Sequence, residues 1–283
     1  MKKKFNIYLS FFLLLILGSC SIAGSWVYEK ADDYLASYFK NYANFSDEQI
    51  NEIENVTENY LDWFTRNELP KIRTVLVDLK DLNVNNADTL IINTYVKGQE
   101  FIEETNNYLE TYFVEFSETL TDLQVIEIGN HFEKLRIKRK ESRKEEGIYS
   151  EEVFSDYISG FKRLNIKLNK TQKDYIRKNI KEINDTRYEW SVFQEKWVEE
   201  LIIILNSRSD QGFDNKLTDH LKAFGSLGGK EFQSIRKMNE QIGIEIISNT
   251  MSNASEKQIN SFKRRIETYI ASIDRILSNR SGD

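Results

Sequence analysis

The 283-residue sequence contains one cysteine, one proline, two histidines and twelve glycines. One cysteine cannot form an internal disulfide. One cysteine and two histidines are also too few for a zinc finger, an iron–sulfur centre, a c-type haem attachment site or the active site of a Cys/His protease. Scarce glycine and proline exclude β-sandwiches, barrels and βαβ folds, which need frequent turns or a glycine-rich loop. We therefore expect neither a cofactor nor a metal.

The composition is that of a folded, water-exposed chain. Hydrophobic residues make up 40% of the sequence and charged residues 30%. This is too apolar for a disordered chain and too polar for a protein that crosses a membrane many times.

The first twenty residues have the pattern of an export signal. Lys2, Lys3 and Lys4 precede an apolar run from Ile7 to Leu17. A basic start, an apolar run of about 11 residues and small residues before a cleavage point are typical of a secretory signal. The run is shorter than the roughly 20 residues that a spanning helix needs. The sequence predicts a signal peptide over 1–19, a lipidated cysteine and tether over 20–26, and an all-helical periplasmic domain over 27–283.

The cysteine lies at the end of this signal, in Leu17-Gly18-Ser19-Cys20. This stretch resembles the bacterial lipobox, which implies diacylation of the Cys20 sulfur, cleavage before Cys20 and acylation of the new amine. Several acyl chains hold a protein stably, at about 0.8 kcal/mol per buried CH₂. By the same resemblance, Ser21 in place of Asp implies the outer membrane, facing the periplasm. The alternative is an ordinary signal with a chance cysteine.

The sequence predicts a membrane as partner, through the anchor at Cys20, and a protein or envelope polymer of unknown identity as a possible second partner. The chain carries a net charge of −6 at pH 7. An acidic exported protein is not expected to bind nucleic acid.

Apolar residues recur every three or four positions through the rest of the chain, which indicates amphipathic helices. The expected helices span 27–43, 46–82, 87–118, 121–145, 150–165, 169–206, 214–224, 229–250 and 255–279. The predicted fold class is all-α, an elongated antiparallel helical bundle with long kinked helices. Pro70 should kink or restart its helix near Leu69.

Four helix starts share one signature, a capping residue followed three positions later by glutamine. The pairs are Ser46 with Gln49, Thr121 with Gln124, Asn169 with Gln172 and Ser255 with Gln258. In such a capping box the two side chains bond each other's backbone N–H groups. Irregular spacings of 75, 48 and 86 residues between the glutamines exclude a solenoid repeat.

These elements also carry a family resemblance. Tyr28-x-x-Ala31-Asp32, the cap ending at Gln49 and Trp63-x-x-Arg66-x-Glu68-Leu69-Pro70 look like an uncharacterised family of bacterial lipoproteins, classed only as a domain of unknown function. Phe64 stands where that family usually has His, and the resemblance implies no established activity. The Leu-Thr-x-x-Gln caps resemble, more weakly, periplasmic chaperones of the Spy type, which are all-helical cradles that hold unfolded clients.

The candidate binding residues are Trp63, Arg66, Glu68, Leu69 and Pro70. Arg66 and Glu68 should point to different helix faces, and Trp63 is placed to stack with Arg66. The alternative is that Trp63 and Leu69 belong to the core, that Pro70 is only a kink and that the charges pair with another helix. His131 and His220 are expected to be ordinary surface or boundary histidines.

A basic run over 134–144 is the second candidate. Its proposed contacts with an anionic surface are Lys138, Arg139, Lys140, Arg143 and Lys144. The partner would be lipid headgroups, cell-wall polymer or acidic clients. The alternative is a solvated helix end, which the negative pole of the helix dipole favours.

Two classes of function remain. The leading interpretation is a non-enzymatic envelope lipoprotein that binds a protein or envelope polymer or has a structural role, with chaperone-like client binding as one form. The alternative is an enzyme that acts on cell wall or lipid with carboxylates brought together across the bundle. A polar pocket that holds two converging acids with raised pKa values would favour the enzyme.

Overall fold

The computed structural model describes residues 28, 30–144 and 148–280, which form helices and connecting segments without any strand. The predicted all-α class is confirmed. The α-helices are α3 (Ala31–Lys40), α4 (Asp47–Trp63), α5 (Leu69–Lys80), α6 (Ala87–Glu118), α7 (Asp122–Lys144), α8 (Tyr149–Arg163), α9 (Lys170–Asn179), α10 (Arg187–Asn206), α11 (Phe213–Ala223), α12 (Gly229–Ser252) and α13 (Glu256–Arg280). The π-helix η2 spans Phe64–Glu68, and the 3₁₀ turns η3 and η4 span Ile180–Glu182 and Phe224–Ser226.

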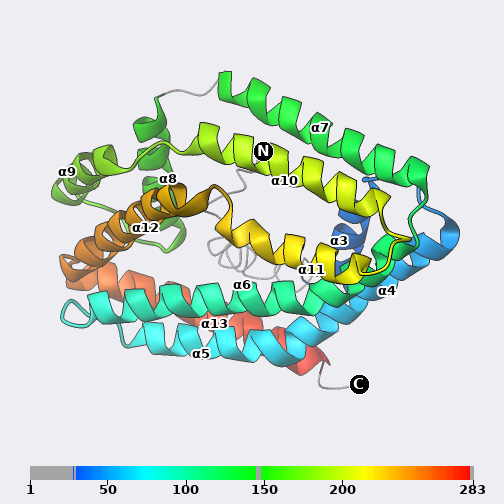
Figure 1. Ribbon diagram of the computed structural model, residues 1–283. Coiled ribbons are helices and arrows are strands. Elements are labelled where there is room, and N and C mark those ends of the chain that lie inside the picture. Colours follow the sequence, from blue (N-terminus) through cyan, green and yellow to red (C-terminus); the bar gives the residue numbers. More distant parts are fainter. Residues whose placement is uncertain (1–27, 29, 145–147, 281–283) are drawn as a thin grey trace.

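The long helices pack in antiparallel pairs (Figure 1). Helix α5 runs against α13, because Arg73 pairs with Asp274 and, farther along, Lys80 pairs with Glu267. Helix α7 runs against α10 in the same manner. In Figure 1, α5, α6 and α13 lie along one side and α7 and α10 along the other.

Two predicted helices are interrupted. The expected helix 169–206 breaks between η3 and α10, at 183–186. There Asn184 bonds Asn239, and the Asp185 carboxylate accepts the Arg187 N–H at 3.1 Å. Short polar side chains that bond the backbone in this way compete with helix formation. The second interruption is η2, after which α5 restarts at Leu69 as expected from Pro70.

All four capping boxes are present, and their glutamines meet in pairs, which the sequence does not reveal. In the first glutamine pair, Gln49 Nε2 donates to Gln124 Oε1 at 3.1 Å, and Gln124 Nε2 donates to Gln49 Oε1 at 2.6 Å. In the second, Gln172 and Gln258 exchange the same bonds at 3.4 and 2.9 Å. Each glutamine therefore caps its own helix and joins a second helix start.

The pairs follow one rule. Each side-chain amide also donates to the carbonyl two residues before its partner's capping residue. These carbonyls belong to Thr119, Asn44, Asn253 and Lys167. The arrangement around each pair is thus close to two-fold symmetric.

The chain repeats this plan in two intertwined halves, 30–144 and 148–280. In 30–144 the order is α3, the capped helix α4, the break η2, then α5, α6 and the capped helix α7. In 148–280 the order is α8, the capped helix α9, the break after η3, then α10, α11, α12 and the capped helix α13. The helix after the break packs on the last helix of the other half: α5 on α13, and α10 on α7. Helices α6 and α12 also pack together, one from each half.

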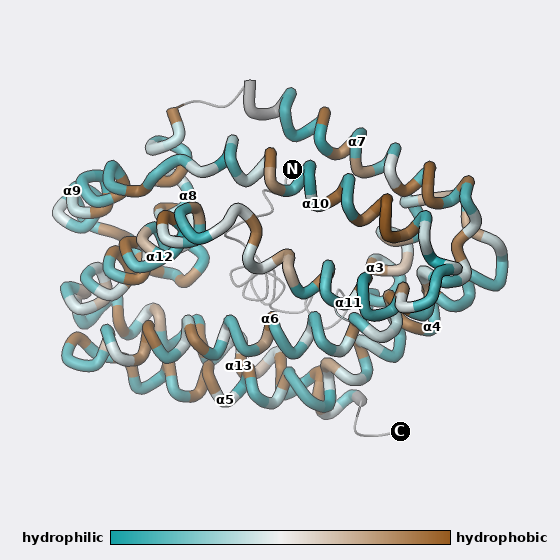
Figure 2. The backbone as a smooth tube through the Cα atoms, viewed as in Figure 1, coloured by the Kyte–Doolittle hydropathy of each residue, from teal (hydrophilic) through white to brown (hydrophobic). Residues whose placement is uncertain are grey.

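Two hydrophobic clusters stabilise this arrangement. The larger includes Leu76, Ile176, Ile246 and Ile273, and the smaller includes Leu217. Figure 2 shows hydrophobic and hydrophilic positions alternating along the helices, as amphipathic packing requires. Every described contact uses residues from Tyr28 onward, so a protein that begins at Ser21 keeps the whole described core.

Candidate functional site

The π-helix η2 forms the centre of the candidate site. Pro70 has no N–H and its ring crowds the carbonyl one turn earlier, so it disturbs the regular ladder. Here the Leu69 N–H donates to the Phe64 carbonyl, one residue farther back than in an α-helix. Asn67 Nδ2 donates to the Trp63 carbonyl at 2.8 Å, and Thr65 Oγ1 donates to the Leu61 carbonyl at 2.6 Å. Such π-bulges are frequent at functional sites.

Glu68 is the most unusual side chain of this segment. It is 1% exposed, and its Oε1 accepts from Lys71 Nζ at 2.8 Å. The same ammonium pairs with Glu104 Oε2 on α6 at 2.5 Å. Glu68 Oε2 has no hydrogen-bond partner among the described residues. The site therefore holds two carboxyl groups bridged by one ammonium group, with one buried oxygen unsatisfied.

The two carboxyl groups differ in acidity. Burial raises the pKa of Glu68 above the ordinary glutamate value, against the opposing effect of Lys71. The bond from Lys71 lowers the pKa of the exposed Glu104. Bonds to Glu104 and Glu68 raise the pKa of Lys71. These shifts make Glu68 the weaker acid of the pair and Glu104 the stronger.

Aromatic rings cover the neighbouring turn of α6. Trp63 is half-buried and stacks on Tyr108, with ring centroids 4.3 Å apart. Tyr60 lies beside both rings, and Tyr112 continues the row. The expected stack of Trp63 on Arg66 is therefore wrong, because the Trp63 ring packs on α6.

The five predicted site residues separate onto two faces. Glu68 and Leu69 are buried, Pro70 is half-buried, and Arg66 is exposed. Trp63 and Glu68 meet α6, whereas Arg66 has no ion pair or ring contact among the described residues. The expectation that Arg66 and Glu68 point to different faces is confirmed.

Three functional side chains were missed by sequence reasoning. Lys71, Glu104 and Tyr108 complete the site, and the latter two lie four residues apart on one face of α6. The sequence offered two signals, this spacing and the position of Lys71 three residues after Glu68, but nothing local in the sequence joins α6 to η2.

Tyr28, the first described residue, contacts this site. Tyr28 is 4% exposed, and its hydroxyl bonds Thr65 Oγ1 of η2 at 2.8 Å. Cys20 and the predicted signal peptide and tether lie outside the described residues, so their expected roles stay predictions.

The second candidate, the basic end of α7, is a partly paired helix surface. Lys138, Arg139 and Lys140 are exposed, and Arg139 donates to Gln194 Oε1 on α10 at 3.2 Å. The side chains of Arg143 and Lys144 lie outside the described set.

The two histidines differ from each other. His131 is half-buried and stacks on Tyr42, and burial lowers its pKa. His220 is buried, which corrects the expected surface or boundary position. It stacks on Trp197, and each residue's ring nitrogen bonds the other's backbone carbonyl. This pair locks α10 to α11.

The described part of the chain shows neither a metal site nor a membrane-spanning helix. No group of three or more His, Cys, Asp or Glu side chains there is placed to hold a metal ion. Among the described helices, none is long and apolar enough to cross a membrane.

Comparison with known proteins gives one match. A family model described as a family of unknown function, DUF6279, matches residues 41–233. No curated protein and no solved structure matches the chain. The matched region includes the π-helix site, the first glutamine pair and Gln172, whereas α13 follows it.

Proposed function

This chain belongs to DUF6279, a family of unknown function, and from that premise we propose that it is a lipid-anchored protein of the bacterial cell envelope. Its role is to bind a protein or an envelope component at the membrane surface. The anchor is the lipidated Cys20 of Leu17-Gly18-Ser19-Cys20, and Ser21 favours the outer membrane, on its periplasmic side.

One observation carries the placement of this role at a membrane: Tyr28, close in sequence to the predicted anchor, is packed into the folded body. Tyr28 is buried and bonded to Thr65, only eight positions after Cys20. Eight residues span at most about 28 Å when fully extended. The π-helix site therefore stays close to the bilayer, as suits a protein that acts at the membrane surface.

Exposed apolar side chains support a binding role. Leu123 and Ile126 on α7 are 63% and 58% exposed, and Ile203 on the adjoining α10 is 68% exposed. Exposed apolar side chains among charged ones suit weak contact with apolar segments of another protein. Chaperone-like client binding is the form of this function that we test.

The anchor is tested by mass spectrometry of the mature protein from cell membranes. We expect an N-terminus at Cys20 with acyl mass attached, and loss of membrane association in Cys20→Ser. Ser21→Asp is the matched control, because it keeps the lipid but should move the protein to the inner membrane. A mature chain without acyl mass would contradict the anchor.

The binding role is tested with the protein that begins at Ser21. At near-stoichiometric ratio it should suppress aggregation of several unfolded proteins, and Leu123→Ser with Ile203→Ser should weaken this effect. Inactivity across all of them would remove client binding. Crosslinking and pull-down from intact cells would then identify another partner.

The second candidate is an enzyme acting on cell wall or lipid, and the Glu68–Glu104 pair is the observation that favours it. Neighbouring carboxyl groups with pKa values displaced in opposite directions can serve as acid and base. The wild-type protein and Glu68→Gln would be incubated with isolated cell wall and with phospholipid. A product that depends on Glu68 would favour the enzyme, and no product from either substrate would count against it.

A further inference from the structure

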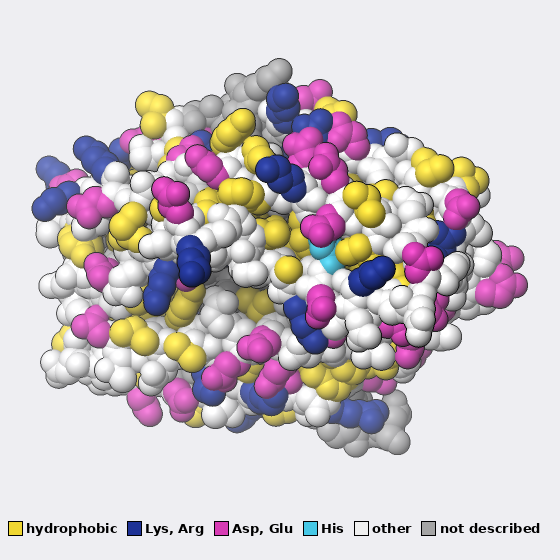
Figure 3. Space-filling view, in the orientation of Figure 1, with side chains coloured by type: hydrophobic (Ala, Val, Ile, Leu, Met, Phe, Trp, Pro, Cys, Tyr) yellow, Lys and Arg dark blue, Asp and Glu magenta, His cyan; other side chains and the backbone are white. Residues whose placement is uncertain are grey.

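The two glutamine pairs lie in surroundings of opposite charge. Around the first pair, 41–65 and 98–133 contain acidic residues and no lysine or arginine. Around the second, 157–173 contains no acidic residue, and 256–265 contains Glu256 alone. Figure 3 agrees, since lysine and arginine side chains gather at the left edge over α9 and acidic ones at the right edge over α4.

We define the basic end by the cations around the second glutamine pair. They are Lys162, Arg163, Lys167, Lys170, Lys173, Lys257, Lys263, Arg264 and Arg265. Four of them line one pocket, on a chain whose net charge is −6.

Several of these cations lack the partners that cations have elsewhere in the molecule. Other helices carry cross-helix ion pairs such as Lys222 with Glu110 at 3.2 Å. Among the described residues, no carboxylate lies within ion-pair distance of Lys162, Arg163 or Arg264. Their charge is therefore available to an external anion.

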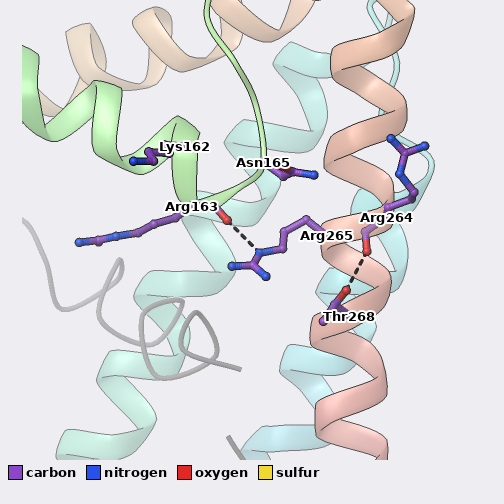
Figure 4. A pocket seen from close by; sticks show the side chains of 6 residues that line it. All are labelled: Lys162, Arg163, Asn165, Arg264, Arg265 and Thr268. Atoms are coloured by element: carbon purple, nitrogen blue, oxygen red, sulfur yellow. Dashed lines mark hydrogen bonds between the residues drawn. The ribbon is translucent and has the colours of Figure 1, made fainter. Parts of the chain in front are cut away.

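A pocket of about 310 Å³ opens within the basic end. The end of α8 contributes Lys162, Arg163 and Asn165, and α13 contributes Arg264, Arg265 and Thr268 (Figure 4). Four of the six lining residues are cations and none is acidic.

The end of α8 fixes one wall of this pocket. Asn165 has φ 60°, and its N–H donates to the Lys162 carbonyl at 3.0 Å. The Ile166 N–H donates to the Phe161 carbonyl at 2.9 Å. These are the two bonds of a Schellman motif, in which Asn tolerates the left-handed conformation.

Bonds between the two segments fix the opposite wall. Arg265 Nε donates to the Arg163 carbonyl at 2.9 Å, and the Tyr269 hydroxyl donates to the same oxygen at 3.3 Å. Gln258 Nε2 donates to the Lys167 carbonyl at 2.8 Å. The bonds to Arg163 thus hold the end of α8 against α13, and the second glutamine pair holds the start of α9 against the same helix, before any ligand binds.

The helix dipole explains only part of this charge. Lys162 and Arg163 end α8, where the negative pole favours cations. Arg264 and Arg265 lie in the third turn of α13, beyond the reach of its poles and on the side of its positive end. Among the described residues, Arg264 has no carboxylate at close range, and the guanidinium of Arg265 lies over the ring of Tyr269.

We propose that the basic end binds the phosphate groups of anionic phospholipids at the membrane surface. Figure 4 shows the charged ends of Lys162 and Arg163 on one side of the pocket and that of Arg264 on the other. Cations spread in this way suit a surface carrying many phosphates better than one enclosed ion. Clusters of four to eight basic residues are typical of anionic-lipid recognition.

This inference rests on the proposed anchor for the presence of a membrane beside the protein. Arg264 and Asp274 are ten residues apart on α13, about 15 Å along the helix. Asp274 pairs with Arg73, which lies on the first turns of α5 next to η2. The basic end and Tyr28, which bonds Thr65 of η2, are therefore close enough for one bilayer to meet both the basic end and an anchor at Cys20.

The test uses the protein that begins at Ser21, so that binding does not depend on an acyl chain. Co-sedimentation is measured with phosphatidylcholine vesicles and with vesicles that also contain phosphatidylglycerol. We expect binding only to the anionic vesicles, and loss of that binding at high salt. The double variant Lys162→Glu/Arg264→Glu should bind at least tenfold more weakly.

The matched control is Lys196→Glu/Lys216→Glu, which makes the same change of charge at exposed lysines of α10 and α11, outside the basic end. It should bind within about threefold of the wild-type protein, because charge outside the contact is screened within a Debye length. Equal losses in both variants, or a loss in the control alone, would overturn the assignment. Circular dichroism checks that both variants remain helical.

Three other outcomes would also overturn it. Absence of wild-type binding to anionic vesicles would remove the basic end as a lipid surface, whereas the acyl mass on Cys20 tests the anchor separately. Release from vesicles by millimolar inorganic phosphate, at constant ionic strength, would indicate a soluble phosphate ligand. A salt-sensitive dimer without vesicles, abolished by Lys162→Glu/Arg264→Glu, would indicate that the basic end binds the acidic end of a second copy.

Discussion

The first glutamine pair makes a quantitative prediction about stability. Replacing Gln124 by Met keeps the shape of the side chain and removes its polar head. The Thr121 N–H and the Asn44 carbonyl lose their bonds to it, and both bonds to Gln49 disappear. A buried polar group left without a partner costs about 1–3 kcal/mol. Because Asn44 and Thr121 are partly open to water, we expect a loss of about 3 kcal/mol for the whole site.

The decisive quantity is the coupling between the two glutamines. Gln49→Met alone should cost a similar amount. The double variant should cost about 2 kcal/mol less than the sum of the single variants, since replacing both members of a hydrogen-bonded pair leaves neither head unpaired. Gln124→Met and Gln258→Met belong to different pairs, and their effects should add within about 0.5 kcal/mol.

Urea unfolding, followed by the helical circular dichroism signal, measures these free energies on the protein that begins at Ser21. Gln241→Met is the matched control, because Gln241 is exposed on α12 and bonds only Glu245. It should change stability by less than about 0.5 kcal/mol. Additive losses for Gln49→Met and Gln124→Met would refute the view that these side chains act as one paired unit.

Three further predictions concern single positions. Gly228 has φ 87°, and a Cβ there would lie 2.5 Å from two phenylalanine rings, so Gly228→Ala should cost about 3 kcal/mol or more in urea unfolding. Gly212→Ala, at φ 83° in open space, should cost only about 1–2 kcal/mol. Tyr28→Phe removes the bond to Thr65 and should lower stability by about 1 kcal/mol and speed tryptic cleavage after Lys30; unchanged cleavage would contradict the proposed fixing of the chain. Burial raises the pKa of Glu68 above its ordinary value of 4.5. The folded protein should therefore lose stability as the pH rises from that value through the raised pKa. Glu68→Gln should gain stability relative to wild type at pH 8 and not at pH 4, and an equal effect at both would show that Glu68 does not titrate in this range.

The sequence alone determined the features that depend on neighbouring residues. Helix periodicity, the four capping boxes and the restart at Pro70 all follow from interactions within one or two turns, and all are present in the structure. The break at 183–186 was not predicted, because Asn184 can either continue a helix or bond Asn239 of α12, and in the structure it bonds Asn239. The break therefore depends on a residue that is far away in the sequence.

Only the tertiary structure decided which caps meet and where charges gather. Gln49 pairs with Gln124 and Gln172 with Gln258 because the two halves of the chain interlock, and no spacing rule encodes that choice. For the same reason, Glu104 meets Glu68 through Lys71, and cations from α8 and α13 line one pocket. Helices and their caps depend only on backbone geometry and adjacent side chains. These sites form only when helices that are distant in the sequence pack together, which the burial of their apolar faces drives.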